Sequence, residues 1–398
     1  MFAEQTDLVS LDAYREGPPF AAFARLRAED PVHWHPEKRG PGFWAITRHA
    51  DVVAVSRDSA TFSSERGGTM LATPDPVELM GIQQMMLNMD PPRHTRLRAL
   101  VNKGFTPRRV ADLEARIGEL ATRIVETAAA RGSFDFVTEV AGELPSFMIA
   151  HLMGIPLDDG RELYRLTERM HASDPDDPMN LDVRTAMGEM MNYSAGLRQK
   201  KAENPGDDIA STLLAAEVDG ERLSEFEFHM FFLLLINAGG DTTRNLVGGG
   251  MQALFEHPEQ RERLRADPGL LDSAIEEMLR WVSPVIHFRR TATRNTEIDG
   301  HAIAEGDKVV VFYSSANRDE TVFAGADRFD VARTPNEHVA FGGGGTHFCL
   351  GANLARLETR SLLARILERM PHLRLAGEIE RLPSNFINGP RRMPVEIE

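Results

Sequence analysis

Phe341-Gly-Gly-Gly-Gly-Thr-His-Phe-Cys-Leu-Gly351 decides the fold, together with the good helix sequence Ala352-Asn-Leu-Ala-Arg-Leu-Glu358 that follows it. Cys349 is the only cysteine among 398 residues, and it stands where the glycine loop enters that helix. The free backbone N–H groups and the positive end of a helix favour a thiolate over a thiol. Four consecutive glycines also allow a close approach to a flat cofactor. We therefore predict a thiolate that ligates iron, with a buried structural cysteine as the alternative.

A second unusual stretch follows the apolar run from Phe226 to Leu235, which predicts a helix through the middle of a large protein. The run leads into Ala238-Gly-Gly-Asp-Thr-Thr243, whose glycines, acid and β-branched residues all lower helix propensity. Such a local violation indicates a site. The Thr242 hydroxyl can bond the carbonyl of Ala238 and open a groove for a small ligand, and Asp241 can relay protons. The alternative is a packing notch, in which the glycines merely allow close helix contact.

The cysteine loop resembles the haem-binding loop of the cytochrome P450 family, with Cys349 at the position of the axial iron ligand. His347 matches the basic position two residues before it, and Gly351 the glycine two residues after it. The family's aromatic residue usually lies seven residues before the cysteine, whereas Phe341 lies eight before it. Glycine can absorb one extra residue, and the loop is similar to a variant in an actinobacterial subgroup that oxidises lipids and steroids.

The resemblance covers nearly the whole chain and implies the fold and the cofactor. It implies a mainly α fold with small β-sheets, in a single domain of residues 1–398. It also implies haem b (iron protoporphyrin IX), bound between the long central helix and the helix that follows Cys349. Oxidation of a C–H bond by a monooxygenase is the implied activity. Within the family, Asp241 and Thr242 resemble the acid–alcohol pair that delivers protons to iron-bound dioxygen.

Further family positions fall on charged residues. The two haem propionates are expected to be held by His94, Arg98 and Arg290, since imidazole and guanidinium groups suit carboxylates. A buried three-residue ionic lock behind the haem is expected from Glu277, Arg280 and Arg333. The alternatives are a solvated basic face for the first group and an ordinary surface pair for Glu277 and Arg280.

The family's substrate-contact segments carry mostly apolar side chains in this chain, which implies a lipophilic substrate. They are Met85, Met86, Ala238, Val285, Ile286, Phe288, Phe386 and Ile387. Methionines and aromatics are more often plain core, which is the alternative here. A fatty acid, terpenoid or steroid is favoured, with tailoring of a polyketide or another natural product as the alternative. A peroxide-driven peroxygenase is disfavoured by the intact acid–alcohol pair, and a non-catalytic haem protein is the remaining rival.

Charge and composition limit the partners. The net charge of −15 argues against nucleic acid. The basic cluster Lys103, Arg108 and Arg109 could steer an acidic ferredoxin, supplied with electrons by a ferredoxin reductase and NAD(P)H, although a plain solvated surface is the alternative. A single cysteine cannot form an intramolecular disulfide, which suits the reducing cytosol. No signal peptide is recognised. The most apolar segment, Met230–Ile236, is too short to span a membrane. We expect a cytoplasmic monomer.

Most of the remaining sequence predicts helix. Apolar residues recur at helical spacing from Val110 to a stop at Gly132, and similar runs occupy roughly 139–153, 183–201, 257–266 and 270–282. Strands are expected at Phe43–Ile46 and Val309–Phe312, with a hairpin over Glu297–Ile303 that turns at Asp299-Gly300. Gly67–Pro76 and His171–Asn180 have loop composition and are candidate lids.

Overall fold

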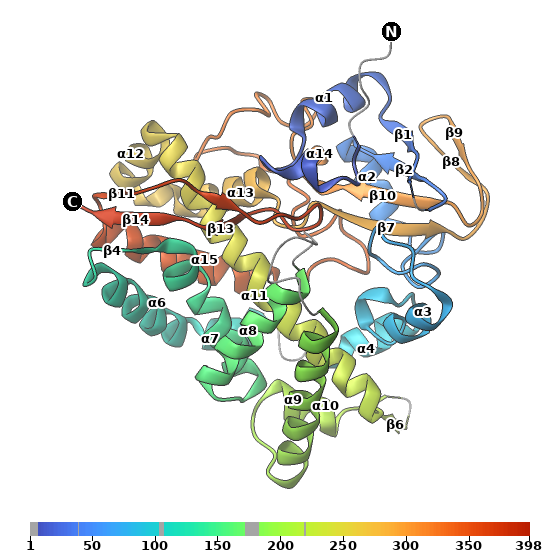
Figure 1. Ribbon diagram of the computed structural model, residues 1–398, viewed down its shortest axis with the longest axis horizontal. Helices are drawn as coiled ribbons and strands as arrows, with labels where there is room; N and C mark the ends of the chain where they lie inside the picture. Colours follow the sequence, from blue (N-terminus) through green and yellow to red (C-terminus); the bar gives the residue numbers. More distant parts are fainter. Residues whose placement is uncertain (1–6, 39, 103–106, 172–182, 219) are drawn as a thin grey trace.

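A single helix, α11 (Glu225–Glu256), forms the axis of the molecule. The computed structural model describes residues 7–38, 40–102, 107–171, 183–218 and 220–398. Ser224 starts α11 with a capping box, in which its hydroxyl accepts from the Glu227 N–H and the Glu227 carboxylate accepts from the Ser224 N–H. Figure 1 shows α11 running diagonally between a β-rich part and a helical part, as the apolar run predicts.

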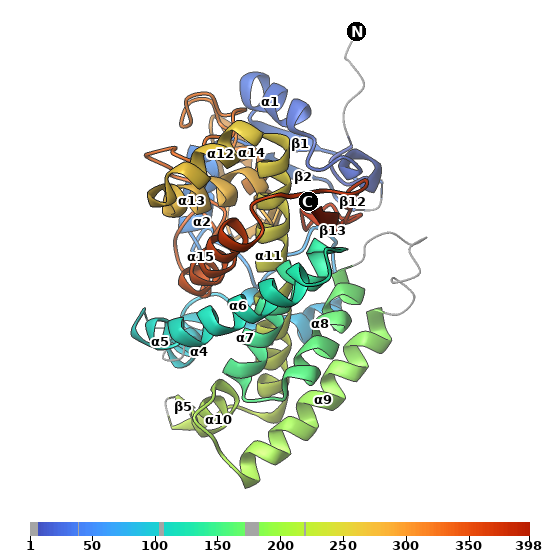
Figure 2. The same ribbon diagram turned by 90° about the vertical axis from the view of Figure 1, so that its left-hand side faces the viewer.

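The helical part packs around α11. Helices α7, α8 and α13 contact it directly, and α6 packs across α15, as Figure 2 shows. The other helices are η1 (Leu11–Tyr14), α1 (Phe20–Glu29), α2 (His49–Arg57), α3 (Pro76–Ile82), η2 (Met86–Asn88), α4 (Arg93–Asn102), α5 (Pro107–Asp112), α6 (Glu114–Ala129), η3 (Val137–Ala141), α7 (Glu143–Met153), α8 (Leu157–His171), α9 (Val183–Glu203), α10 (Ile209–Ala215), α12 (Pro258–Ala266), η5 (Pro268–Leu270), α13 (Leu271–Val282), α14 (Tyr313–Ala316) and α15 (Ala352–Arg369).

The β-rich part is a five-stranded sheet of order β1-β2-β10-β7-β3. Only β10 and β2 pair in parallel among its neighbours, with Val310 opposite Ala45. Its strands are β1 (Val32–His35), β2 (Phe43–Ile46), β3 (Phe62–Ser63), β7 (His287–Ala292) and β10 (Lys308–Phe312). The small sheets contain β4 (Ser133–Asp135), β5 (Glu217–Val218), β6 (Glu221–Arg222), β8 (Thr296–Ile298), β9 (His301–Ile303), β11 (Leu373–Leu375), β12 (Glu380–Arg381), β13 (Pro390–Arg392) and β14 (Pro394–Ile397).

Several local expectations are met and two are corrected. The predicted hairpin forms from β8 and β9, and Asp299 and Gly300 turn it with positive φ angles of 46° and 79°. The helix expected from Val110 is interrupted, because α5 ends at Asp112 and α6 begins at Glu114. The run at 139–153 opens with the π-helical turn η3 before α7. Residues 172–180 of the second candidate lid lie outside the described residues.

Membrane-spanning segments were expected to be absent. Among the described residues no single helix has the length and apolar character needed to cross a bilayer. One bent pair, Val137–Met153 with Leu157–Met170, meets those two criteria jointly at an angle of 115°.

Candidate active site

The glycine loop before Cys349 is shaped by close contact with α2. The Cys349 N–H donates to the carbonyl oxygen of Phe341 at 3.0 Å, which closes the loop. A Cβ on Gly345 would lie 2.7 Å from the carbonyl oxygen of Ser56. Positive φ angles of 93°, 94° and 76° occur at Gly342, Gly344 and Gly345. The extra residue is therefore accommodated by glycine conformations that other residues rarely adopt.

Cys349 itself is exposed and lies three residues before the first residue of α15, Ala352. Burial by the surrounding protein still raises the pKa of its thiol, although the Gly351 backbone and the charges of Arg98 and Arg356 act in the opposite direction. The Cys349 thiol is thus accessible to solvent but is surrounded by protein atoms, as expected for a side chain that faces an internal space. The thiolate at Cys349 therefore stays a prediction: the Gly351 backbone lowers the pKa of the thiol as the loop pattern indicates, and a bound cation would lower it further.

Four basic side chains converge beside this loop. The rings of His94 and His347 lie 4.3 Å apart, and the Ser64 hydroxyl lies 3.2 Å from His347 Nε2. Burial, with Arg98 and Arg290 nearby, lowers the pKa of His94 to about 4. Burial and the same two arginines lower that of His347 to about 2. Both imidazoles are therefore neutral between two guanidinium groups, so the cluster carries positive charge.

The cluster suits an anionic cofactor. Arg290 is 3% exposed, and its hydrogen bond is to the neutral Arg289 carbonyl at 2.7 Å. His94 Nδ1 and Thr346 Oγ1 are buried without a hydrogen-bond partner. In the described part of the chain, no ion pair joins His94, Arg98 or Arg290 to a carboxylate. Because buried cations and unpaired donors require acceptors, this set together with an exposed thiol fits a haem and its two propionates.

Arg98 makes contacts with the cysteine loop that were not expected. Its guanidinium donates to the carbonyl oxygen of Thr346 at 2.9 Å and also to that of Phe348. Arg98 therefore ties α4 to the loop around Cys349, in addition to carrying charge at the cluster. The basic residues Arg108 and Arg109 lie in α5, but their side chains, like all of Lys103, lie outside the described residues.

The stretch Ala238–Thr243 has two different sides. The Thr242 hydroxyl donates to the Ala238 carbonyl at 2.9 Å, as predicted. Ala238 is exposed and Thr242 half-buried, although α11 is mostly buried around them. On the other side, a Cβ on Gly239 would lie 3.0 Å from Ile149 and one on Gly240 3.0 Å from Tyr164. The glycines thus admit α7 and α8, so the packing notch and the open face coexist.

Asp241 directly precedes the half-buried Thr242 in the chain, but its own side chain is fully buried. Arg244 donates to its Oδ1 at 2.5 Å. Arg244 also pairs with Glu168 of α8 and lies over the ring of Tyr164 at 5.3 Å. The sequence interpretation missed Arg244 and Glu168. The spacing of three between Asp241 and Arg244 could have indicated the first, whereas nothing local connects Glu168 to α11.

Glu277, Arg280 and Arg333 meet in a buried network. Both oxygens of Glu277 accept from Arg280 at 2.8 Å, and Arg333 Nε donates to the same carboxylate at 3.0 Å. Asn336 and the Asp330 N–H add two further donors at 3.1 and 2.9 Å. Arg280 also donates to the carbonyls of 317, 326 and 328. The surface-pair alternative is therefore wrong for Glu277 and Arg280, which are both 0% exposed.

The expected substrate-contact residues divide into two groups. Met85, Val285, Phe288 and Phe386 are half-buried, and Ala238 is exposed. The rings of Phe288 and Phe386 lie 5.6 Å apart, and Val285 bridges to Ile387 between the two segments. Met86 and Ile387 are buried. Ile286 is 1% exposed and packs with Phe43 and Phe312 in a hydrophobic core, which favours the plain-core alternative for it, as burial also does for Met86 and Ile387.

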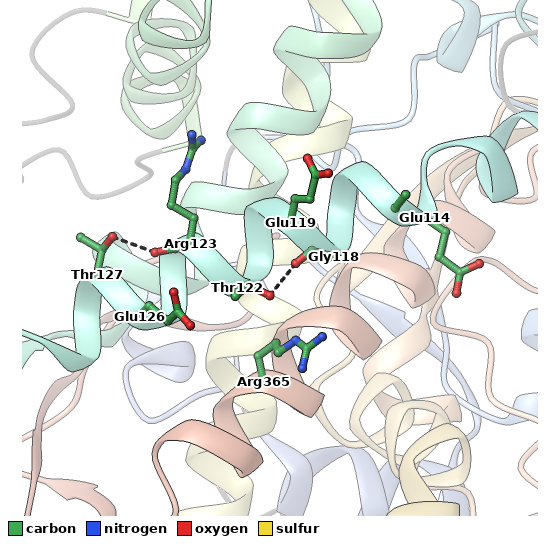
Figure 3. Close-up of a pocket in the computed structure, with 9 residues that line it drawn as sticks. Glu114, Gly118, Glu119, Thr122, Arg123, Glu126, Thr127 and Arg365 are labelled. Carbon is green, nitrogen blue, oxygen red and sulfur yellow. Dashed lines mark hydrogen bonds between the residues drawn. The ribbon is translucent and has the colours of Figure 1, made fainter.

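A separate hollow of about 750 Å³ lies at the surface between α6 and α15, as Figure 3 shows. Its wall includes the exposed side chains of Glu114, Glu119 and Arg123, with Arg365 from α15. None of the predicted site residues lines it. It therefore has no part in the candidate active site.

Comparisons with known proteins agree with this geometry. The family model of cytochrome P450 matches residues 182–381. A steroid C26-monooxygenase of Mycobacterium tuberculosis is 40% identical over 393 residues, covering 96% of this chain and 90% of that protein. A methyl-branched lipid omega-hydroxylase of the same species is 42% identical over 397 residues, covering 96% and 91%. The structure of Mycobacterium marinum cytochrome P450 CYP268A2 with pseudoionone superposes with a TM-score of 0.91 at 39% identity, covering 100% of both chains. With a loop, a basic cluster and a central helix that fit haem b, the chain belongs to the cytochrome P450 family of haem-thiolate monooxygenases.

Proposed function

We propose that this monooxygenase hydroxylates the end of a methyl-branched hydrocarbon chain in a fatty acid, terpenoid or steroid. Three relatives support the proposal: one is named a steroid C26-monooxygenase, one a methyl-branched lipid omega-hydroxylase, and one was solved in complex with pseudoionone. The half-buried apolar residues Met85, Val285, Phe288 and Phe386 are consistent with a lipophilic chain beside the exposed Ala238.

The observation that carries the proposal is an exposed thiol beside a buried basic cluster, in a chain whose central helix α11 has an open face at Ala238 and Thr242. In this proposal Cys349 would ligate the haem iron, and His94, Arg98 and Arg290 would hold the propionates, with His347 packed against His94. Bound haem supplies activation of dioxygen, which thiolate donation promotes. The Thr242 hydroxyl would donate a proton at the open face of α11. Asp241 would then supply Thr242 with a replacement proton. Glu277, Arg280 and Arg333 hold the loops behind the site.

Electrons are proposed to come from NAD(P)H through a ferredoxin reductase and a ferredoxin. The sequence places the basic residues Lys103, Arg108 and Arg109 close together in a chain of net charge −15, and such a local positive cluster supports docking of an acidic carrier. We propose that the chain works as a cytoplasmic monomer.

The experiment compares two isomers that differ only in branching, iso-heptadecanoic acid and heptadecanoic acid, together with pseudoionone. Purified holoenzyme receives NADPH, a ferredoxin and its reductase, and products are located by mass spectrometry. We expect oxidation at the branched end, with a kcat/KM about tenfold or more above that for the straight chain, since one misplaced methyl costs about 1–3 kcal/mol in a pocket. Equal oxidation of both acids along their chains would overturn the proposed specificity.

Ligation by Cys349 is tested on the same preparations. The reduced protein under carbon monoxide should show the long-wavelength absorption of a thiolate complex, and Cys349→Ser should lose it. Ser63→Ala, a change outside the ligand set, is the control and should keep the band. A band that survives in Cys349→Ser, or product formed equally well with hydrogen peroxide alone, would contradict the proposed mechanism.

A further inference from the structure

Arg244 bridges two carboxylates that belong to different helices. Its Nη2 donates to Asp241 Oδ1 at 2.5 Å within α11, while its Nη1 donates to Glu168 Oε1 of α8. Arg244 is 1% exposed and Asp241 0%, whereas the side chain of Glu168 is 18% exposed. One guanidinium is thus shared by a sealed carboxylate and by a carboxylate that water can reach.

The surroundings fix this bridge in place. The Tyr164 hydroxyl donates to Glu168 Oε1 at 3.4 Å, and its ring lies 5.3 Å under the Arg244 guanidinium. A Cβ on Gly142 would lie 3.5 Å from both Tyr164 Oη and Arg244 Cδ, so these two side chains pack beside the Gly142 backbone. Because one guanidinium makes both ion pairs, a change at one carboxylate affects its attraction for the other.

The charge of Glu168 changes how strongly Arg244 attracts Asp241. A guanidinium in a buried ion pair stabilises the carboxylate and opposes its protonation. Asp241 must accept a proton before it can pass one to Thr242. If Arg244 paired with Asp241 alone, its full attraction for the carboxylate would slow that protonation. A second carboxylate on the other edge of Arg244 lessens its attraction for Asp241. The same contact keeps Arg244 turned toward α8.

From this geometry we infer that Glu168 is a positioning residue for proton delivery, which weakens the hold of Arg244 on Asp241. The inference rests on the proposed role of Asp241 and adds a residue from another helix to it. Asp241 accepts a proton at its carboxylate and gives it up on the Thr242 side, and Glu168 acts only through its ion pair with Arg244. No group is oxidised or reduced by this network.

Glu168→Gln tests the inference, because it keeps the size and a hydrogen-bond acceptor but removes the charge. The holoenzyme is supplied with NADPH, a ferredoxin, its reductase and pseudoionone, and NADPH oxidation, peroxide and product are measured in H₂O and D₂O. We expect NADPH oxidation to fall about tenfold, less than the factor of about 10² or more that a general acid–base group itself contributes. The solvent isotope effect should rise, and the acidic limb of the pH profile should move to lower pH. Glu168→Asp should recover most of the rate.

Glu162→Gln is the matched control, since Glu162 is also on α8 but pairs with Arg165 at the surface with 59% of its side chain exposed. It should leave all readouts unchanged. A Glu168→Gln enzyme that behaves like this control, or that slows without a change in isotope effect and pH profile, would overturn the inference. Asp241→Asn distinguishes failure of the proposed function from failure of this inference. If it leaves the rate and the isotope effect unchanged, the proposed role of Asp241 is wrong. If Asp241→Asn has an effect and Glu168→Gln has none, only the role assigned to Glu168 is wrong.

Discussion

Arg290 combines full burial with a charge that the protein alone leaves poorly compensated. The side chain is 3% exposed, and burial lowers its pKa although Tyr313 and Asp90 act in the opposite direction. We predict that Arg290→Gln loses haem faster, because a charge-assisted hydrogen bond contributes about 1.5–3 kcal/mol, equivalent to about 10- to 100-fold in rate. Transfer of haem to excess apomyoglobin, followed by absorbance, measures that rate.

Arg294→Gln provides the comparison at this scale, since Arg294 follows the same strand and donates to the Thr61 hydroxyl at 2.8 Å. It should release haem at the wild-type rate. Identical rates for the two variants would show that Arg290 holds no propionate.

At the scale of elements, Glu277 joins α13 to the irregular segment that precedes the cysteine loop. Its carboxylate receives Arg280, Arg333, Asn336 and the Asp330 N–H. Removing one partner of a buried ionic network leaves the other charges uncompensated and costs about 3–5 kcal/mol. We predict that Glu277→Ala loses stability by this amount and incorporates little haem, as measured by the haem-to-protein absorbance ratio and by urea unfolding.

Glu259→Ala in the neighbouring helix α12 is the control. If removal of any glutamate in this region lowered stability, this variant would be destabilised as well. Glu259 is 65% exposed in its side chain and 3.8 Å from His257. This control should change stability by less than about 0.5 kcal/mol. Full haem loading of Glu277→Ala would refute the structural role.

Local sequence patterns predicted elements and failed for long-range partners. The β8–β9 hairpin, α11 and the Thr242–Ala238 hydrogen bond follow from contacts within a few residues, so periodicity and turn chemistry were enough. The pairing of Arg244 with Glu168 spans 76 residues, and nothing local encodes it.

The same limit applies to side-chain direction. Ile286 lies in a predicted contact segment, yet its side chain packs in the core with Phe43 and Phe312, because contacts with strands far away in the sequence decide which way it faces. The pKa of the Cys349 thiol shows the same limit. The Gly351 backbone lowers it, as the loop pattern indicates, whereas burial by the whole protein raises it, and no local pattern reports that burial.

At the scale of the whole molecule, the buried groups His287 and Glu358 make stability depend on pH in opposite directions. Burial lowers the pKa of His287 from 6.5 to about 4, so its contribution is lost as pH falls through that interval. Glu358 of α15 acts in the opposite direction. It is 2% exposed, its Oε2 has no hydrogen-bond partner, and burial raises its pKa from 4.5 to about 8.

A carboxyl with a raised pKa binds a proton in the folded state that the unfolded chain has released above pH 4.5. Its stabilising contribution is therefore complete below that pH and is lost as pH rises toward 8. We predict that the free energy of unfolding of the holoenzyme falls by about 2 kcal/mol between about pH 6.5 and 8, and that Glu358→Gln removes this fall. Urea unfolding followed by circular dichroism at several pH values measures it. Glu368→Gln, at the exposed end of the same helix, should retain the wild-type slope. The slope is the decisive quantity, because a buried amide can lower stability at every pH without changing it, and a Glu358→Gln protein with the wild-type slope would show that Glu358 is not protonated in the fold.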